Sequence, residues 1–316
     1  MNILILGAGM QGTLYGVRLA RAGHSVTLIA RGRRAAELRE QGAIIENALS
    51  GERSVIHLPV ADTLAQSPPA DLCLITVRRE QLDSVLSAVA AAPHVKRIVV
   101  MVNHACGSDK LFAGFKRERI VLGFPGTAGG IESGVDRYLD IRQQPTVIDA
   151  SSRDIAQVLR DAGFRVSLVH DVDSWLRRHA VFVTAVSGAL YEVDGDARRL
   201  AADPARVRRM IGAIREAWAA MDRLGIAKPP LALRAIFQWV PLAFAVLYWR
   251  RLFASPKGEL YFAKHARHAS IEMAALASDV RALLHDEPTP ELNQLYATIH
   301  ATALRAQARS GAASSF

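Results

Sequence analysis

Short apolar runs rich in Val, Ile and Leu alternate with helical patterns over residues 2–170 of the chain. This alternation is typical of parallel βαβ units, in which buried strands are joined by helices. The expected strands are Ile3–Leu6, Val26–Ala30, Leu72–Val77, Ile98–Val102, Ile120–Leu122, Thr146–Ile148 and Val166–Val169. The pattern predicts an α/β domain over residues 1–170, with a Rossmann-type doubly wound parallel sheet.

Strand patterns stop after Asp171, and helical signals replace them. Asp203-Pro204 is typical of an N-cap followed by proline in the first turn, and Thr289-Pro290 repeats this signal. After Pro204, one helical face carries Val207, Ile211, Ile214, Trp218 and Met221. We therefore expect an all-α domain over residues 171–308. Residues 310–315 are small or polar and have nothing to bury, so residues 309–316 are expected to form a flexible tail.

The composition narrows the class of protein. The 316 residues are 50% apolar and contain only two cysteines, Cys73 and Cys106, which are too few for a disulfide framework. No run of apolar residues is long enough for a membrane span, so we expect a cytoplasmic protein. The net charge is +9, but the arginines are spread along the chain without a nucleic-acid-binding motif. We expect no nucleic-acid partner.

A glycine-rich turn follows the first expected strand and opens a helix. In such a turn the first glycine allows the sharp bend, the second lets backbone approach a pyrophosphate, and the third lets the helix pack closely on the strand. The phosphates then lie at the helix N-terminus. The residues expected to bind a dinucleotide here are Gly7, Ala8, Gly9, Met10, Gln11 and Gly12.

The end of the second expected strand indicates which dinucleotide binds. A carboxylate there would hydrogen-bond the ribose hydroxyls of NAD, but the chain has Arg31-Gly32-Arg33-Arg34 instead. A guanidinium group pairs well with phosphate oxygens, so we predict NADP(H) with Arg31 at the 2′-phosphate. The alternative is that these arginines form the solvated start of a helix.

Four motifs in this order resemble the ketopantoate reductase family. They are the glycine turn at 7–12, Ala30-Arg31-Gly32, Thr76-Val77-Arg78-Arg79-Glu80-Gln81 and Val102-Asn103-His104-Ala105-Cys106-Gly107. The resemblance extends more loosely to Ser174-Trp175-Leu176-Arg177-Arg178 and to Thr289-Pro290. It implies that the cofactor is lined by Thr76, Val77, Arg78 and Gln81. It also implies that Asn103 contacts the nicotinamide ribose and holds the substrate, unless Asn103 is only a turn residue at a strand end.

The resemblance breaks at the residues implied to handle the substrate. Arg178 stands where the family has a catalytic lysine, and arginine is a poor general acid because it is essentially never deprotonated. Arg178 is therefore expected to bind a carboxylate or the developing oxyanion. Phe182 and Val186 replace two asparagines, and Ser270 replaces a glutamate. Because these polar contacts are lost, we predict a substrate other than ketopantoate.

Histidines offer alternative proton donors. His179 follows Arg178 directly, and His265 and His268 lie three residues apart on an expected helix. Each is open to the simpler interpretation of a surface imidazole or a satisfied buried one. Because no third ligand stands at a recognisable spacing, we expect no metal site.

Residues 235–249 form the most apolar stretch of the chain and contain two of its four tryptophans. Pro241 divides the stretch, so membrane contact is not the expected role. A buried helix pair, a homodimer face and the wall of a pocket for an apolar substrate remain open.

These observations favour an NADPH-dependent oxidoreductase that transfers hydride to the carbonyl of a 2-oxo acid or related ketone. In this hypothesis Asn103 and Arg178 are catalytic, and His179, Phe182, Val186 and Ser270 contact the small-molecule substrate. The alternative is an NADP(H)-binding sensor or partner-binding protein that has lost catalysis.

Overall fold

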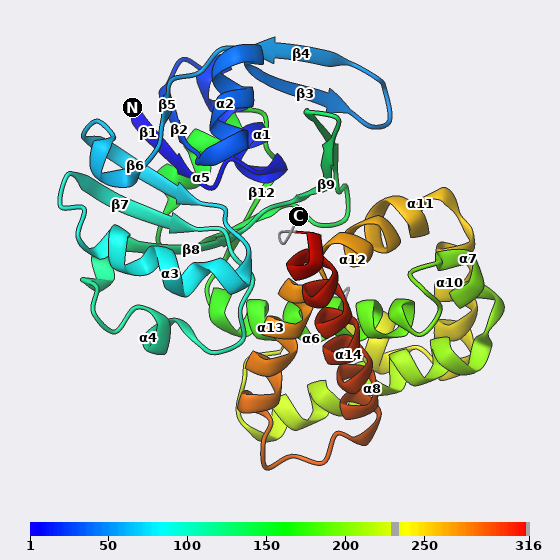
Figure 1. Cartoon of the computed structure of the whole chain (residues 1–316). Coiled ribbons are helices and arrows are strands. Elements are labelled where there is room, and N and C mark those ends of the chain that lie inside the picture. Colours follow the sequence, from blue (N-terminus) through cyan, green and yellow to red (C-terminus); the bar gives the residue numbers. More distant parts are fainter. Residues whose placement is uncertain (229–233, 314–316) are drawn as a thin grey trace. The chain divides into compact units, whose positions relative to one another are not determined.

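The computed structural model describes residues 1–228 and 234–313 (Figure 1). The chain forms two compact units. Unit 1 consists of Met1–Val102 and Ser108–Val172, and unit 2 consists of Asn103–Gly107 and Asp173–Phe316. The main division falls after Val172 rather than after residue 170. The short segment Asn103–Gly107 belongs to unit 2, although its sequence neighbours on both sides belong to unit 1.

An eight-stranded sheet forms the centre of unit 1, in the order β12-β11-β8-β7-β6-β1-β2-β5. The strands are β1 (Asn2–Leu6), β2 (Ser25–Ile29), β5 (Val60–Ala61), β6 (Ala70–Ile75), β7 (Val95–Val100), β8 (Ile120–Phe124), β11 (Thr146–Asp149) and β12 (Val166–Val169). β1 pairs in parallel with β2 and β6, and Leu6 lies opposite both Ile29 and Ile75. The strand order therefore reverses beside β1, and in such sheets ligands bind at the carboxyl ends near the reversal.

The Rossmann-type sheet and all seven expected strands are confirmed. Central strands are buried on both faces, as parallel strands covered by helices usually are, and Ile3, Leu4 and Ile5 are at most 1% exposed. One pairing differs from the expectation, because β11 runs antiparallel to β8. The connection between β8 and β11 consists of two further strands and contains no helix. A parallel pair needs a crossover connection, which is usually a helix.

A second sheet of four strands, in the order β4-β3-β10-β9, was not predicted. It consists of β3 (Ala43–Asn47), β4 (Arg53–Ile56), β9 (Thr127–Glu132) and β10 (Val135–Asp140). These strands mix apolar residues with polar residues or glycine, and none has an apolar run of more than three residues. Pairing of Asp136 with Ile45 joins segments about ninety residues apart, so the sheet depends on tertiary contact.

Helices complete unit 1. They are α1 (Met10–Arg21), α2 (Gly32–Gln41), α3 (Arg79–Ala90), α4 (Ser108–Leu111) and α5 (Arg153–Asp161), with 3₁₀ turns η1 (Leu64–Gln66) and η2 (Arg117–Arg119). α1 packs on β1 and β2 and also contacts β3, β9 and β10. The helix that opens at the glycine turn therefore contacts both sheets.

The described elements of unit 2 are all helical. They are α6 (Val172–Tyr191), α7 (Ala197–Ala202), α8 (Pro204–Arg223), α10 (Leu242–Ala254), α11 (Pro256–Gly258), α12 (Lys264–His268), α13 (Ser270–Leu283) and α14 (Pro290–Ala313), with π-helical turns η3 (Ala235–Trp239) and η4 (Glu259–Ala263). The Asp203 side chain accepts hydrogen bonds from the backbone N–H groups of Ala205 and Arg206, which confirms the predicted cap of α8. Its predicted apolar face is buried in the helical core.

Two expectations about unit 2 change. The expected tail is wrong for residues 309–313, because α14 continues to Ala313. Arg309, Ala312 and Ala313 favour helix, whereas Ser310 and Gly311 do not. Residues 314–316 lie outside the described range. The apolar stretch 235–249 is divided between η3 and α10, with Phe237 and Trp249 buried and Phe244 and Tyr248 exposed. Among the described residues, no helix combines the length and the apolar character that a membrane span requires.

Candidate active site

The predicted glycine turn joins β1 to α1 in unit 1. Gly7 has φ +107°, a conformation that residues with a Cβ rarely adopt. A Cβ on Gly12 would lie 2.1 Å from the Gly7 carbonyl oxygen and 2.5 Å from Thr76 Oγ1, so only glycine fits there. A Cβ on Gly9 would meet no heavy atom within 4 Å. Gly7 and Gly12 thus shape the turn, whereas Gly9 borders open space at the N-cap of α1.

This turn fits the pyrophosphate of a dinucleotide. α1 has twelve residues, no acidic side chain in its first turn and Gly9 at its N-cap. The unpaired N–H groups at its start and the positive end of its dipole therefore favour an anion in the open space beside Gly9. Of the other predicted turn residues, Ala8 and Met10 are buried, so their side chains support the turn. The Gln11 side chain donates to the Thr127 carbonyl oxygen at 2.7 Å and is held against β9.

The second predicted motif lies beside the first. Thr76 Oγ1 donates a hydrogen bond to the Gly7 carbonyl oxygen at 2.8 Å, and Val77 lies against Gly7. Arg78 is exposed at the N-cap of α3, where Gln81 Oε1 accepts a hydrogen bond from the Arg78 backbone N–H at 3.2 Å. Thr76 and Val77 therefore support the glycine turn. Gln81 caps α3, and Arg78 places an exposed positive charge at the N-terminus of that helix.

The arginines after β2 differ in their contacts. Arg31 is exposed at the N-cap of α2, and no hydrogen bond or ion pair of its side chain is found among the described residues. Arg33 is exposed and pairs with Glu37 at 3.3 Å. Arg34 donates to the Ala8 carbonyl oxygen at 2.9 Å and to the Asp136 carboxylate. Arg34 therefore braces the glycine turn, whereas Arg31 is available to a ligand.

Asp136 is the partner that holds Arg34 in place. Its side chain lies on β10 and is fully buried. Burial raises the pKa of Asp136 to about 6, although the Arg34 guanidinium and the Thr13 hydroxyl oppose this rise. Sequence analysis missed this pair, since no local pattern relates residues 34 and 136.

The predicted site residue Asn103 lies in unit 2, in the segment Asn103–Gly107. Its Nδ2 donates a hydrogen bond to His179 Nδ1 of α6 at 3.2 Å, and the side chain is only 7% exposed. The segment is also tied to α13, because the Ala105 backbone N–H donates to Asp279 Oδ2 at 3.4 Å. Asn103 is therefore more than a turn residue at a strand end, since its side chain is anchored on the helical unit.

The structure contradicts the role expected for Arg178. Its side chain is 1% exposed, and Nε donates to the Ala227 carbonyl oxygen at 2.7 Å. The remaining nitrogens donate to the carbonyl oxygens of Trp218 and Ile226 and to Asp222 Oδ1. A buried guanidinium with these partners holds α6 to the end of α8 and does not present donors to a substrate.

His179 lies next to Arg178 on α6 but in different surroundings. Its imidazole stacks on Trp175 with ring centroids 4.8 Å apart and an interplanar angle of 11°, and the ring of Phe182 meets it edge-on at 6.0 Å. His179 as a whole residue is half-buried. Burial, with a smaller contribution from His265, lowers the pKa of His179 to about 3, so the ring is neutral near pH 7. Sequence analysis named Trp175 only within a family motif and not as a site residue, although its spacing of four residues from His179 places both on one helical face.

The predicted apolar substrate contacts separate into two groups. Phe182 is partly exposed and touches the rings of Phe237, Trp249 and Phe262. Val186 is 1% exposed inside the helical core, so its expected contact with substrate is wrong. Ser270 is 8% exposed at the start of α13. The partly exposed aromatic face of α6 thus consists of Trp175, His179 and Phe182.

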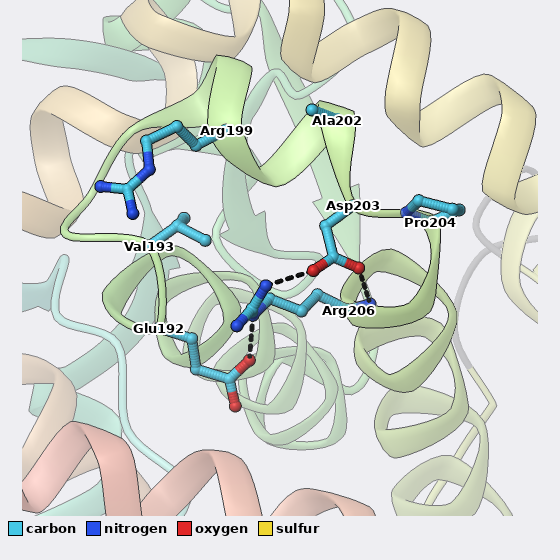
Figure 2. Close-up of a pocket in the computed structure, with 7 residues that line it drawn as sticks. All are labelled: Glu192, Val193, Arg199, Ala202, Asp203, Pro204 and Arg206. Atoms are coloured by element: carbon cyan, nitrogen blue, oxygen red, sulfur yellow. Dashed lines mark hydrogen bonds and ion pairs between the residues drawn. The ribbon is translucent and has the colours of Figure 1, made fainter.

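Two pockets within unit 2 lie elsewhere. Figure 2 shows the first, a hollow of about 360 Å³ in which Arg206 lies between Glu192 and Asp203 and pairs with both. The second has about 610 Å³ and is bordered by Asp196 and Arg267. None of the predicted site residues lines either pocket. The described residues also contain no group of three or more histidine, cysteine and acidic side chains placed to hold a metal ion.

Residues 3–134 match the family model described as "Ketopantoate reductase PanE/ApbA". Over these residues the chain is similar to the ketopantoate reductases. The resemblance drawn from the sequence motifs is therefore confirmed, and the relatives are oxidoreductases. The matched region contains the glycine turn, Arg31, Thr76–Gln81 and Asn103.

Curated relatives agree with the family match. The 2-dehydropantoate 2-reductase of Archaeoglobus fulgidus is 24% identical over 193 residues, which cover 59% of this chain and 62% of the relative. The enzyme of the same name from Pyrococcus horikoshii is 24% identical over 206 residues, which cover 62% of this chain and 66% of the relative. The chain thus spans less than two thirds of the length of these curated relatives.

Solved structures share the fold over nearly the whole chain. A PanE/ApbA family ketopantoate reductase from Ralstonia eutropha JMP134 has a TM-score of 0.78 at 20% identity, covering 97% of this chain and 100% of its own. A 2-dehydropantoate 2-reductase from Geobacter metallireducens GS-15 has a TM-score of 0.77 at 16% identity, covering 96% and 100%. D-mandelate dehydrogenase, solved with NADH and anilino(oxo)acetate, has a TM-score of 0.72 at 16% identity, covering 96% and 98%.

Proposed function

We propose that this protein is an NADP(H)-dependent oxidoreductase that reduces the carbonyl group of a 2-oxo acid. The observation that carries this proposal is the intact dinucleotide turn, in which Gly7 and Gly12 have no room for a side chain and Gly9 borders open space at the N-cap of α1. The match of residues 3–134 to a family of oxidoreductases supports the same reaction class.

The preference for NADP(H) rests on Arg31. Its side chain is exposed beside the carboxyl end of β2, where NAD-binding proteins usually have a carboxylate. A guanidinium at this position attracts a 2′-phosphate by charge and by paired hydrogen bonds. Arg34 is not the phosphate ligand in this proposal, because the Ala8 carbonyl oxygen and Asp136 already hold it. The NADH in the D-mandelate dehydrogenase structure is the competing cofactor to test.

We further propose that the substrate carries an aromatic or bulky apolar side chain and is not ketopantoate. The partly exposed face of α6 presents the aromatic rings of Trp175 and Phe182, and Phe182 continues into a cluster with Phe237, Trp249 and Phe262. Such rings favour contact with apolar groups over the polar substituents of ketopantoate. The ligand named with D-mandelate dehydrogenase, anilino(oxo)acetate, has this combination of an aromatic ring and a 2-oxo acid group.

In the proposed reaction, the bound cofactor supplies a hydride to the carbonyl carbon of the substrate. The carbonyl π electrons move to oxygen, which takes up one proton, so that a 2-oxo acid becomes a 2-hydroxy acid. The glycine turn and Arg31 would hold the pyrophosphate and 2′-phosphate. By the family resemblance, Asn103 would contact the nicotinamide ribose and the substrate.

The experiment has two parts. NADPH and NADH are titrated into the purified protein by fluorescence, and a panel of 2-oxo acids that includes ketopantoate and phenylglyoxylate is then screened by the absorbance of the reduced cofactor. We expect tighter binding of NADPH and the highest kcat/KM with an aromatic 2-oxo acid. Preferred turnover of ketopantoate would contradict the proposed substrate class, and NADPH binding without any turnover would support a cofactor-binding protein that has lost catalysis.

A further inference from the structure

Two carbonyl groups of the glycine turn are held by side chains from other elements of unit 1. Thr76, directly after β6, donates from Oγ1 to the Gly7 carbonyl oxygen at 2.8 Å. Arg34 of α2 donates from Nε to the Ala8 carbonyl oxygen at 2.9 Å. Two successive peptide groups of the turn are therefore fixed in orientation, and the second of them joins Ala8 to Gly9.

The contact with Arg34 determines where the Gly9 N–H group points. The described residues contain no cis peptide bond, and in a trans peptide the N–H points away from the carbonyl oxygen. The Gly9 N–H is thus directed to the side of the turn opposite the guanidinium group. No acceptor for it is found in the described part of the chain, and Gly9 borders open space. The charge of Arg34 also polarises this peptide group, which makes its N–H a stronger donor.

Asp136 of the second sheet keeps the guanidinium group in this position. Its side chain is fully buried and pairs with Nη2 of Arg34, and the same nitrogen donates to Thr13 Oγ1 of α1 at 3.0 Å. Nη1 lies 3.7 Å from a carboxylate oxygen of Glu37. The guanidinium group therefore bridges α1, α2 and β10. A buried carboxylate without its partner is costly, so Asp136 favours the arrangement in which Arg34 stays against the turn.

A second contact ties the start of α1 to the same sheet. Gln11 Nε2 donates to the Thr127 carbonyl oxygen at 2.7 Å, and Thr127 Oγ1 donates back to Gln11 Oε1. Both strands of the β9–β10 pair thus hold the β1–α1 connection, one through Gln11 and the other through Arg34. The second sheet therefore supports the part of unit 1 that the glycine turn makes suitable for a pyrophosphate.

We propose that Arg34 is a positioning residue that orients the Ala8–Gly9 peptide, so that the Gly9 N–H donates to the pyrophosphate of the cofactor, and that Asp136 holds Arg34 for this purpose. This inference rests on the proposed function, because it concerns the cofactor of that reaction. Arg34 acts through the backbone and does not contact the cofactor itself. Its effect is therefore on the pyrophosphate, which NADPH and NADH share, and not on the choice between them.

Fluorescence titration of Arg34→Met with both cofactors tests this role. Methionine keeps the apolar stem of the side chain but has no donor for the Ala8 carbonyl oxygen. We expect the Kd for NADPH and the Kd for NADH to rise by the same factor, at least about tenfold, because the loss is at the shared pyrophosphate. A rise for NADPH alone would make Arg34 a ligand of the 2′-phosphate and would overturn the inference. The control for general charge is Arg33→Met, because Arg33 is a neighbouring exposed arginine, and its Kd values should stay near those of the wild type.

A double variant separates positioning from stability. Arg34→Met leaves the buried Asp136 without its partner, whereas Arg34→Met/Asp136→Leu removes both charges and puts apolar groups in their place. Urea unfolding should show that the double variant is about as stable as the wild type, because such apolar replacements are often neutral. Both Kd values should nevertheless stay raised. Kd values within about threefold of the wild type would show that Arg34 acts only through stability, and would overturn the inference.

Proton–nitrogen NMR of the ¹⁵N-glycine-labelled protein examines the proposed donor directly, with Gly9→Ala for assignment. The Gly9 amide proton signal should move downfield when NADPH saturates the wild type, because a hydrogen bond to phosphate deshields the proton. It should move less in Arg34→Met, also at saturation. Equal shifts in the two proteins would overturn the role of Arg34.

These measurements do not depend on turnover, so they distinguish the inference from the proposed function. If the wild type binds both cofactors and the variants behave as expected, but no 2-oxo acid is reduced, the proposed function fails and the role of Arg34 holds. If 2-oxo acids are reduced and Arg34→Met binds both cofactors normally, the inference fails alone. A wild type that binds neither cofactor would overturn both.

Discussion

Three arginines show how burial decides what a guanidinium does. Arg178 is enclosed by carbonyl oxygens and Asp222 and therefore stabilises the helical unit. Arg34 bonds the Ala8 carbonyl oxygen and Asp136, so it supports the glycine turn from behind. Arg31 is exposed at the start of α2. Of these three arginines, only Arg31 has an exposed side chain that no described residue holds, as a ligand-binding group requires.

Replacing Arg31 tests the cofactor preference. In Arg31→Glu, the 2′-phosphate of NADPH loses a charged hydrogen-bonding partner worth about 1.5–3 kcal/mol and meets a negative charge instead. We expect the Kd for NADPH to rise at least tenfold, while the Kd for NADH stays equal or falls because a carboxylate can bind ribose hydroxyls. Fluorescence titration with both cofactors measures the two constants.

The matched control is Arg33→Glu. Arg33 lies two residues after Arg31, is equally basic, has a side chain that is 93% exposed and pairs with Glu37. If Arg33→Glu weakens NADPH binding as much as Arg31→Glu does, the effect is one of general charge and Arg31 has no specific role.

At the scale of elements, the turn between β1 and α1 depends on two different kinds of glycine. A side chain on Gly12 would overlap the Gly7 carbonyl oxygen and Thr76, so this glycine allows α1 to lie close to the strand. A side chain on Gly9 would overlap nothing, and its φ of −73° suits any residue. The fold therefore does not require glycine at position 9, and in the proposed function this space receives the pyrophosphate.

Alanine substitutions separate these two requirements. Gly12→Ala should lower the free energy of unfolding by about 1–3 kcal/mol, because the turn must shift to relieve the overlap. Gly9→Ala should change stability by less than about 0.5 kcal/mol but weaken NADPH binding at least tenfold, since its methyl group enters the space for the pyrophosphate. Urea unfolding and fluorescence titration give both quantities. Normal NADPH binding by Gly9→Ala would rule out a pyrophosphate at this turn.

At the scale of the whole molecule, the chain carries a net charge of +9, yet many of its arginines are paired with carboxylates. Most of these pairs are exposed and contribute little to stability. Arg34 with Asp136 differs, because the carboxylate is buried and the pair joins α2 to the second sheet of unit 1. Because burial raises the pKa of the Asp136 carboxyl, we expect the stability of the protein to depend on pH.

Asp136 should lower stability as the pH rises from about 4 to 6. Its pKa is about 6 in the folded protein and 3.8 as the ordinary value, so in this window the folded state binds more protons than the unfolded state. The free energy of unfolding of the wild type, relative to Asp136→Asn, should therefore fall by roughly 2–3 kcal/mol between pH 4 and pH 7. Urea unfolding at several pH values measures the difference.

Asp140→Asn is the control for this experiment. Asp140 lies on the same strand but has a side chain that is 47% exposed and paired with Arg18. Asp140→Asn leaves the buried Asp136 carboxyl in place, so this variant should keep the dependence of stability on pH that the wild type shows. A constant difference between Asp136→Asn and the wild type would show that the buried carboxyl does not take up a proton near pH 6.

Features that depend on local spacing could be predicted from the amino-acid sequence. Continuous apolar runs predicted the buried strands, glycines at positions 7, 9 and 12 predicted the dinucleotide turn, and Asp203-Pro204 predicted a helix start. Each of these signals lies within a short segment of neighbouring residues, so local sterics and local hydrogen bonds are enough to determine it. The family resemblance also followed from such short motifs.

The tertiary structure alone decided which side chains are available for chemistry. Nothing local distinguishes Arg178 from His179, but the carbonyl oxygens of residues 218, 226 and 227 enclose the first, and Asn103 and Trp175 orient the second. The second sheet and the Arg34–Asp136 pair likewise join segments about ninety or more residues apart. Burial and hydrogen-bond partners are set by which segments meet in space, and the spacing of residues along the chain does not contain that information.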